Sequence, residues 1–245
     1  MPVQTKALLP KLVSNSSSGL ESVVGGRLGA ATAAAAAATA TARSAGGVLV
    51  LLHGEVGAGK SVLVRGALRR LSGRADLRVP SPTYLVCNKY VLGGGQLVVD
   101  HFDLHRLVGP LGELDAKVVG LVESLDKVRL GAGNSKAKTC CFVEWPDRLF
   151  VGDPSVDVVP WLRPSWPLVW LNVDVDVVQG GAAQESVQAF TVDHDSDEDA
   201  DLEQDVPRAV TISVGWRTET ETLAEGLKID LSNAVAKAFE SGACS

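Results

Sequence analysis

The sequence is poor in cysteine and in aromatic residues, and it has no long apolar segment. Four cysteines occur in 245 residues, and none has the CxxC spacing of a zinc or redox site. Adjacent Cys140 and Cys141 point to opposite faces if their segment is a strand. The Ala/Thr run from Ala30 to Ala42 is shorter than the roughly 20 residues that cross a bilayer. We therefore expect reduced thiols, no zinc and no membrane partner.

The chain also lacks an excess of basic residues. Its formal net charge is -6 and its pI is about 5.3, whereas a protein that holds nucleic acid on its own surface usually has a basic patch. Much of the negative charge lies in DHDSDEDADLEQD, residues 193–205. Any contact with RNA is therefore expected to be indirect, through a partner protein.

The composition suggests one main domain with less regular ends. Residues 1–17 contain lysines and hydroxyls but no acid, which fits either a disordered leader or an organellar transit peptide. The folded domain is expected at residues 18–216, with a disordered acidic insert at about 186–206, followed by a helix and tail at 217–245. We expect a cytoplasmic protein, with the mitochondrion or plastid as the alternative.

Strand-like and helix-like segments alternate along the domain. VLVLLHG, from Val48 to Gly54, is a continuous apolar run, as expected for a strand buried on both faces of a parallel sheet. Lys60 to Leu71 places its apolar residues largely on one side of a helix. Further strands are expected at residues 83–90, 97–102, 139–143, 168–178 and 209–214, and further helices at 18–42, 111–130 and 219–239. The alternation predicts an α/β domain with a mostly parallel sheet, helices on both faces and a closing C-terminal hairpin.

A phosphate-binding motif connects the first of these strands to the helix. GEVGAGKS satisfies the GxxxxGK[ST] pattern of a P-loop and has the strand before it and the helix after it that the motif requires. Backbone N–H groups of such a loop converge on a phosphate at the positive end of the helix. Lys60 is expected to reach the terminal phosphates, and the Ser61 hydroxyl to bind Mg²⁺. The predicted nucleotide-binding residues of this loop are Gly54, Glu55, Val56, Gly57, Ala58, Gly59, Lys60, Ser61 and Val62. These residues predict a P-loop NTPase-like fold that binds a nucleoside triphosphate and Mg²⁺.

Two acidic residues end later strands. TCCFVEWPDRL is an apolar strand that ends in Glu144, the Walker-B arrangement, although an acid at a strand end can also be purely structural. LVVDHFDLHRL ends in Asp103, which could orient an attacking water or hold the outer shell of the metal. Trp145 follows Glu144, where a tryptophan more often belongs to the core than to a nucleotide or partner surface.

Four motifs together resemble the TsaE family, which acts in the synthesis of threonylcarbamoyladenosine on tRNA. They are GEVGAGKS, SPTY from Ser81, HFDLHRL from His101 and VEWP from Val143, and their order and spacing are similar to the family's across residues 48–150. The resemblance implies a compact P-loop fold and weak intrinsic ATPase activity. It also implies action with TsaB and TsaD type partners, with tRNA contacted only through that complex.

The resemblance further implies roles for single residues. Glu144 matches the Mg²⁺ ligand, shared with the P-loop serine, and Asp103 matches the catalytic acid beside it. Thr83 matches the threonine of a switch-like loop that could sense the terminal phosphate. Ser22 and Arg208 lie about where the family contacts the nucleotide.

The chain departs from the family's motifs at two positions. His105 stands where the family usually has tyrosine in HFDLYR, and Val62 stands where a second threonine usually follows the P-loop Ser/Thr. His105 can keep the tyrosine's hydrogen bond, whereas Val62 cannot donate one. These departures bear on nucleotide affinity and turnover more than on the location of the site.

Other functions remain open. A non-catalytic interaction module would bind nucleotide only to order its partners, and a small-molecule P-loop kinase shares the motif, although no arginine-rich lid is evident. His101, Asp103 and His105 alternate, so a strand would place them on one face and could imitate a metal-dependent hydrolase. A module would tolerate loss of Asp103 but not of Lys60, whereas an ATPase would tolerate neither.

Overall fold

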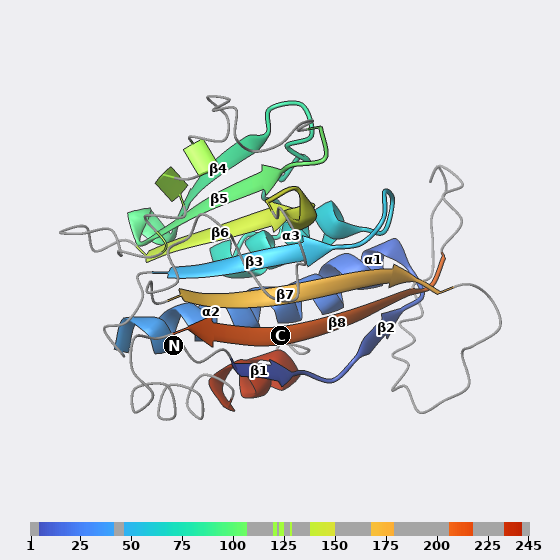
Figure 1. Cartoon of the computed structure of the whole chain (residues 1–245), viewed down its shortest axis with the longest axis horizontal. Coiled ribbons are helices and arrows are strands. Elements are labelled where there is room, and N and C mark those ends of the chain that lie inside the picture. The colour runs from blue at the N-terminus through green and yellow to red at the C-terminus, as the bar shows by residue number, and fades with distance from the viewer. Residues whose placement is uncertain are drawn as a thin grey trace.

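A computed structural model describes most of the chain. The described residues are 5–41, 47–106, 120, 121, 123, 124, 128, 138–149, 168–178, 206–217 and 233–241. They form one twisted sheet with helices packed against it (Figure 1). Within these ranges no helix is long and apolar enough to cross a membrane.

Within the described residues the sheet has eight strands, and the strands at its centre are parallel. The strands are β1 (Thr5–Leu8), β2 (Leu12–Ser14), β3 (Gly47–His53), β4 (Cys87–Leu92), β5 (Leu97–Asp103), β6 (Lys138–Glu144), β7 (Leu168–Val177) and β8 (Arg208–Arg217). Their order is β1-β8-β7-β3-β6-β5-β4, and β2 also pairs with β8. The pairs β5–β6, β6–β3 and β3–β7 are parallel, and the pairs toward both edges are antiparallel. The expected parallel sheet is therefore confirmed for the four central strands, and β7 and β8 form the expected antiparallel closing pair.

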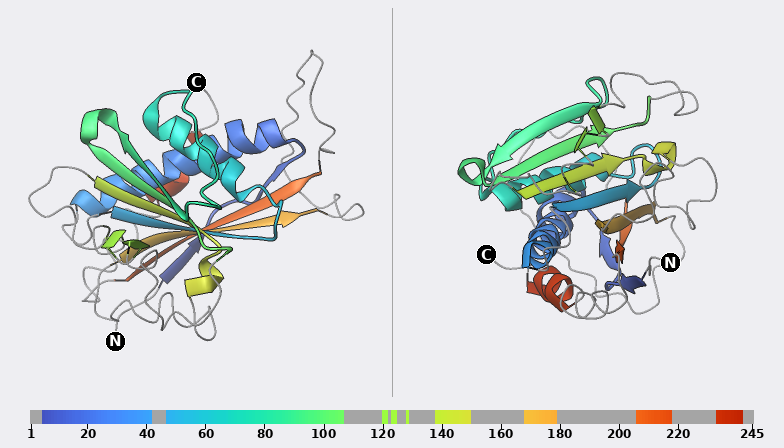
Figure 2. Two further views of the ribbon diagram at one scale, coloured as in Figure 1. Left: turned by 90° about the horizontal axis from the view of Figure 1, so that it is seen from above. Right: turned by 60° about the vertical axis from the view of Figure 1, so that its left-hand side comes forward.

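Helical segments pack against this sheet. They are α1 (Ser17–Gly19), the π-helix η1 (Leu20–Gly25), α2 (Gly26–Thr41), α3 (Lys60–Ser72), the short 3-10 segments η2 (Gly93–Gly95) and η3 (Pro146–Leu149), and a helix at residues 233–241. The helices α2, α3 and 233–241 lie together on one face (Figure 2). Leu121 and Val128, which are helical, pack on the other face.

Strand β3 is buried on both sides, as its unbroken apolar run predicts. Its residues Val48, Val50 and Leu52 join the core beneath α2 and α3, whereas Leu49 and Leu51 join the core of the opposite face. In the neighbouring β6, Cys140 and Cys141 fall into these two different cores, so the predicted opposition of the two thiols is confirmed. The alternation fixes which residues of β5 and β6 face α3, and therefore which side chains reach the P-loop.

The N-terminal helical segment packs against α3 through glycines. A Cβ atom on Gly66 would lie 2.0 Å from the carbonyl oxygen of Glu21, and one on Gly25 would lie 2.9 Å from the Cα of Gly66. The Glu21 carboxylate pairs with the guanidinium groups of Arg65 and Arg69 on α3. Backbone contact and ion pairs thus hold η1 beside the helix that begins at the P-loop.

Both ends of the chain contribute more to the fold than the composition suggested. Within residues 1–17, for which a disordered leader or a transit peptide is expected, β1 and β2 pair with β8 along the sheet edge. Of the helix predicted at 219–239, residues 233–239 lie within the described helix at 233–241, and its Val235 and Phe239 are buried in the main core. Arg27 of α2 also lies over the Phe239 ring, 5.9 Å from its centroid. The folded unit therefore extends beyond residues 18–216.

The strand expected at 83–90 begins only at Cys87. The amide groups of Leu85 and Val86 donate to the carbonyl oxygen of Pro82, which closes a turn, and Val86 has a left-handed φ of 65°. A residue in that conformation cannot continue a strand. The acidic insert up to residue 205 and most of the 111–130 helix lie outside the described residues.

Candidate functional site

The P-loop motif forms a tight turn between β3 and α3. Gly54, Gly57 and Gly59 have φ values of 133°, 78° and 100°, a region that strains any residue with a side chain. Helix α3 then begins at Lys60, and the amide of Leu63 donates to the carbonyl oxygen of Gly59 as its first helical bond. The earlier amides have no intrahelical acceptor, so the turn leaves N–H donors and the positive helix end beside the loop.

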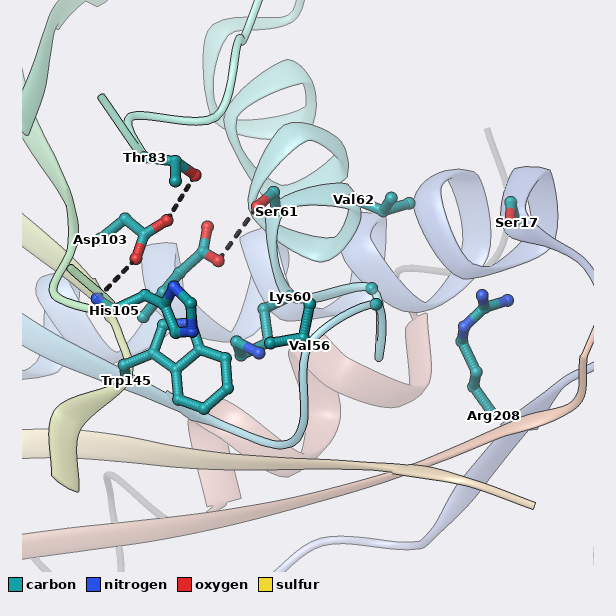
Figure 3. Close-up of a pocket in the computed structure, with 13 residues that line it drawn as sticks. Ser17, Val56, Lys60, Ser61, Val62, Thr83, Asp103, His105, Trp145 and Arg208 are labelled. Atoms are coloured by element: carbon teal, nitrogen blue, oxygen red, sulfur yellow. Dashed lines mark hydrogen bonds between the residues drawn. The ribbon is translucent and has the colours of Figure 1, made fainter. Parts of the chain in front are cut away.

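A cavity of about 290 Å³ opens beside this turn. It is lined by Ser17, Val56, Gly57, Gly59, Lys60, Ser61, Val62, Thr83, Asp103, His105, Glu144, Trp145 and Arg208. Figure 3 shows Thr83 and Asp103 at one end, Ser17 and Arg208 at the other, and Lys60 between them. Segments from across the whole sequence therefore converge at the carboxyl ends of the central strands, where open α/β sheets bind ligands.

Lys60 lies buried at the centre of the cavity wall. Its Nζ donates to the carbonyl oxygens of Gly54 and Glu55, both at 2.8 Å, and lies 3.9 Å from the centroid of the Trp145 ring. Burial lowers the pKa of Lys60, and the carboxylates of Glu144, Asp103 and Asp147 partly oppose that shift. The ammonium group is thus a desolvated cation, stabilised by two carbonyl groups and the Trp145 ring, and it can neutralise a bound anion.

Ser61 and Glu144 bring two oxygen ligands together. The Ser61 hydroxyl donates to Oε2 of Glu144 at 3.0 Å and lies 3.3 Å from the Ser81 hydroxyl. Glu144 itself is buried, with 2% of its surface exposed, at the end of β6. Hydroxyl and carboxylate oxygens are the hard ligands that Mg²⁺ prefers, so this donor pair fits that ion.

Asp103 is held by two donors at the end of β5. The Thr83 hydroxyl donates to its Oδ2 at 2.6 Å, and the backbone N–H of His105 donates to its Oδ1 at 2.9 Å. The Ser81 and Thr83 hydroxyls are 2.8 Å apart. A chain of hydroxyls on the loop before β4 therefore connects the Asp103 carboxylate to Ser61.

The residue after Glu144 both packs and lines the cavity. Trp145 has a left-handed φ of 61°, and its amide donates to the carbonyl oxygen of Leu52 at 3.2 Å. Its ring packs against the second core and lies 4.7 Å, centroid to centroid, from the His105 ring. His105, one of the two departures from the family motif, thus also forms part of the cavity wall.

The far end of the cavity contains Ser17 and Arg208, but not Ser22, which was expected there. Arg208, at the start of β8, lines the cavity as expected, and its Nη1 donates to the carbonyl oxygen of Val206 at 3.1 Å. Ser22 does not line the cavity, because its hydroxyl turns back to the carbonyl oxygen of Ser18 inside the N-terminal helical segment. Ser17 occupies the lining position instead. No sequence motif marks Ser17, because its position depends on how η1 packs on α3.

The remaining predicted residues have supporting or peripheral positions. Ala58 is buried beneath the loop, and Gly54 and Glu55 take part through their carbonyl groups. Val56 and Val62 line the cavity with apolar side chains.

The alternating His101, Asp103 and His105 do not converge on a common point. His101 contacts Glu144, Asp103 contacts Thr83, and His105 lies beyond the end of β5. In the part of the chain that the structure describes, no group of three or more His, Cys, Asp or Glu side chains could hold a metal ion by itself. The geometry therefore gives no support to the metal-dependent hydrolase.

Comparison with known proteins supplies the context for this cavity. A family model described as threonylcarbamoyl adenosine biosynthesis protein TsaE matches residues 27–160. Three curated relatives each carry the name tRNA threonylcarbamoyladenosine biosynthesis protein TsaE. The Haemophilus influenzae protein is 30% identical over 101 residues, covering 41% of this chain and 53% of the relative. The Streptomyces coelicolor protein is 34% identical over 143 residues, covering 55% and 90%, and the Synechocystis protein is 34% identical over 103 residues, covering 42% and 57%. The match thus spans about half the length of the first and third relatives and most of the second.

Proposed function

This chain belongs to the TsaE family of threonylcarbamoyl adenosine biosynthesis proteins, and on that basis we propose that it binds ATP and hydrolyses it slowly. In this proposal it acts as a component of the machinery that makes N6-threonylcarbamoyladenosine on tRNA. The observation that carries the proposal is the convergence of Lys60, Ser61, Glu144 and Asp103 on one cavity beside the P-loop.

The proposed phosphate contacts follow from the charge of the cavity. When triphosphate enters, Lys60 exchanges its two carbonyl acceptors for phosphate oxygens, a stronger charge-assisted contact for a buried ammonium group. The free amides at the start of α3 donate to the same phosphates. Binding is therefore favoured because the anion neutralises a cation that the fold has already desolvated.

Ser61 and Glu144 are the residues that would hold Mg²⁺. The ion, when bound, neutralises charge on the phosphates. Asp103 would accept a hydrogen bond from the attacking water and orient it toward the terminal phosphorus. Each carboxylate oxygen has two lone pairs, so Asp103 can accept from water while Thr83 and His105 remain bound.

We propose TsaB and TsaD type proteins as the partners, with tRNA contacted only through them. The net charge of -6 supports the indirect contact, since it gives the chain no excess of basic residues for the phosphate backbone. A cytoplasmic location, or a mitochondrial or plastid one, completes the proposal.

A non-catalytic interaction module is the second candidate, and the contacts of Asp103 favour it. Both of its oxygens accept protein hydrogen bonds, and Thr83 holds one of them at 2.6 Å. If the terminal phosphate drew Thr83 away, the loop from Ser81 would change position without any turnover. Nucleotide occupancy alone could then order a partner.

Separate substitution of the two acids tests these roles. Glu144→Gln should weaken nucleotide binding mainly when Mg²⁺ is present, because the amide is a poorer ligand for a hard cation. Asp103→Asn should keep nucleotide binding and slow hydrolysis. Asp147→Asn is the matched control, since Asp147 lies near Lys60 and 3.3 Å from His53 but does not line the cavity.

The measurements are equilibrium binding of a fluorescent ATP analogue with and without Mg²⁺, and phosphate release in the presence of the partners. Equal Mg²⁺-dependent losses in the Glu144 and Asp103 variants would contradict the division of roles. Wild-type turnover in both variants would leave the interaction module as the better account.

A further inference from the structure

A buried histidine that has no role so far lies behind Glu144. His101 is fully buried on β5, two residues before Asp103 and on the same face of the strand. Its Nε2 lies 2.8 Å from Oε1 of Glu144, while Oε2 of the same carboxylate accepts the Ser61 hydroxyl. The Glu144 carboxylate is therefore held at both oxygens, by the histidine on the core side and by the P-loop serine on the cavity side.

The contact fixes which nitrogen of the ring carries hydrogen. An ionised carboxylate only accepts hydrogen bonds, so Nε2 of His101 must be the donor to Glu144. The other nitrogen, Nδ1, is buried and has no hydrogen-bond partner among the described residues. An apolar side chain at this position would leave no buried nitrogen unpaired, so core packing alone does not explain an imidazole here.

We propose that His101 is a positioning residue, which orients the Glu144 carboxylate so that Oε2 faces Ser61 and the Mg²⁺ of the proposed nucleotide complex. The inference rests on the proposed function. The terminal torsion of a glutamate side chain has a broad, roughly two-fold energy profile, so loss of the His101 contact would leave the orientation of the carboxylate less restricted. His101 does not line the cavity and so cannot contact the nucleotide directly.

The register of the sheet explains how the contact arises. Asp103 of β5 is the parallel partner of Glu144 of β6, and His101 is the partner of Phe142. The Glu144 side chain reaches back over one residue pair to His101, which places its Oε1 in the core and its Oε2 at the cavity. Hydrogen bonds of this kind behind a metal ligand typically change metal affinity by about 10- to 100-fold when they are removed.

Two amide substitutions of His101 separate positioning from packing. His101→Gln places an amide nitrogen near the position of Nε2 and should keep the contact with Glu144. His101→Asn places its amide near the position of Nδ1, too short to reach Glu144. Both variants bury one amide, so a role in packing alone would affect them similarly, with the smaller asparagine leaving only a somewhat larger void.

The readout is the dissociation constant of a fluorescent ADP analogue, measured for the whole chain in Mg²⁺ and in EDTA. The dissociation constant in EDTA divided by that in Mg²⁺ gives the Mg²⁺ ratio, which reports how strongly Mg²⁺ strengthens binding, independently of turnover. We expect His101→Asn to lower this ratio about tenfold or more, toward the Glu144→Gln value, with binding in EDTA unchanged. His101→Gln should stay within about threefold of wild type, because an amide can replace the imidazole as donor.

A control substitution on the other face of β5 shows whether a general loss of stability alone changes the Mg²⁺ ratio. Ser124→Ala removes the hydroxyl that donates to buried Asp100 at 2.7 Å, and it should leave the Mg²⁺ ratio unchanged. Equal ratios for wild type and His101→Asn, or equal losses in His101→Asn and His101→Gln, would overturn the inference alone. If wild type bound no nucleotide in either condition, the proposed function would fail, and the inference would fail with it.

Discussion

Replacement of Thr83 by valine tests the contact that connects the loop before β4 to the catalytic end of the cavity. Valine keeps the shape of threonine but removes the hydroxyl that donates to Asp103 at 2.6 Å and lies 2.8 Å from the Ser81 hydroxyl. A hydrogen bond to a charged group contributes about 1.5 to 3 kcal/mol. Because Thr83 is only half-buried, water can replace part of the contact, and we expect a loss near the lower end, about 1.5 kcal/mol.

The assay is thermal unfolding of the nucleotide-free protein. For a domain of 150 to 250 residues, 1 kcal/mol corresponds to about 2 to 4 °C in Tm, so the variant should melt about 3 to 6 °C below wild type. Ser81→Ala is the matched control, because it removes a hydroxyl from the same loop without touching Asp103 and should cost clearly less.

A double-mutant cycle with Asp103→Asn isolates the pair. If the Thr83 hydroxyl stabilises the loop through the Asp103 carboxylate, the losses should be non-additive by about 1 kcal/mol or more. Losses that add to within about 0.5 kcal/mol would refute the reasoning, and so would an unchanged Tm in Thr83→Val.

Two further perturbations follow from the same geometry. Lys60→Met should abolish nucleotide binding in a folded protein, as measured by titration with an ATP analogue. Burial lowers the pKa of Lys60 in the folded protein below its ordinary value of 10.5. At pH values between the lowered pKa and 10.5, the folded wild type binds fewer protons than the unfolded chain, so its free energy of unfolding should rise with pH in that window. Denaturant unfolding should show a smaller rise in the methionine variant, and an identical pH dependence would contradict the assignment. Gly66→Ala should lower stability by about 1 to 3 kcal/mol, since the new Cβ meets the Glu21 carbonyl at 2.0 Å. Gly26→Ala, with nothing within 4 Å of its Cβ, should be neutral or stabilise by up to about 1 kcal/mol, so equal effects of the two glycine changes would argue against the close helix contact.

The P-loop and its flanking elements could be predicted because their signals are local. The buried strand, the glycines and the Lys-Ser pair at the helix start all lie between Val48 and Ser61, and each dictates its own backbone conformation. The end of β6 at Glu144 is also visible in the sequence, as an apolar run that stops at an acid. The end of β5 at Asp103 is visible only as a second acid at a strand end, because that strand also contains Asp100 and His101. Parallel strands then bring both acids to the same edge of the sheet.

Features that depend on long-range pairing could not be predicted in the same way. Residues 5–8 and 12–14 have an unremarkable composition, and they form strands through pairing with β8. The exchange of Ser22 for Ser17 at the cavity depends on the glycine contact between η1 and α3. The pairing of His101 with Glu144 depends on the register of β5 and β6, which no spacing in the sequence reveals.

Phosphate release from ATP, with and without TsaB and TsaD type partners, tests the central claim most directly. The account predicts slow, Mg²⁺-dependent phosphate release by the wild-type chain and a faster rate when both partners are present. With the Lys60→Met chain, phosphate release should not exceed that of the partners alone. Release by Lys60→Met equal to wild type would contradict the assignment of the cavity. Absence of release by wild type at saturating Mg²⁺ and ATP, with partners present, would contradict the ATPase itself.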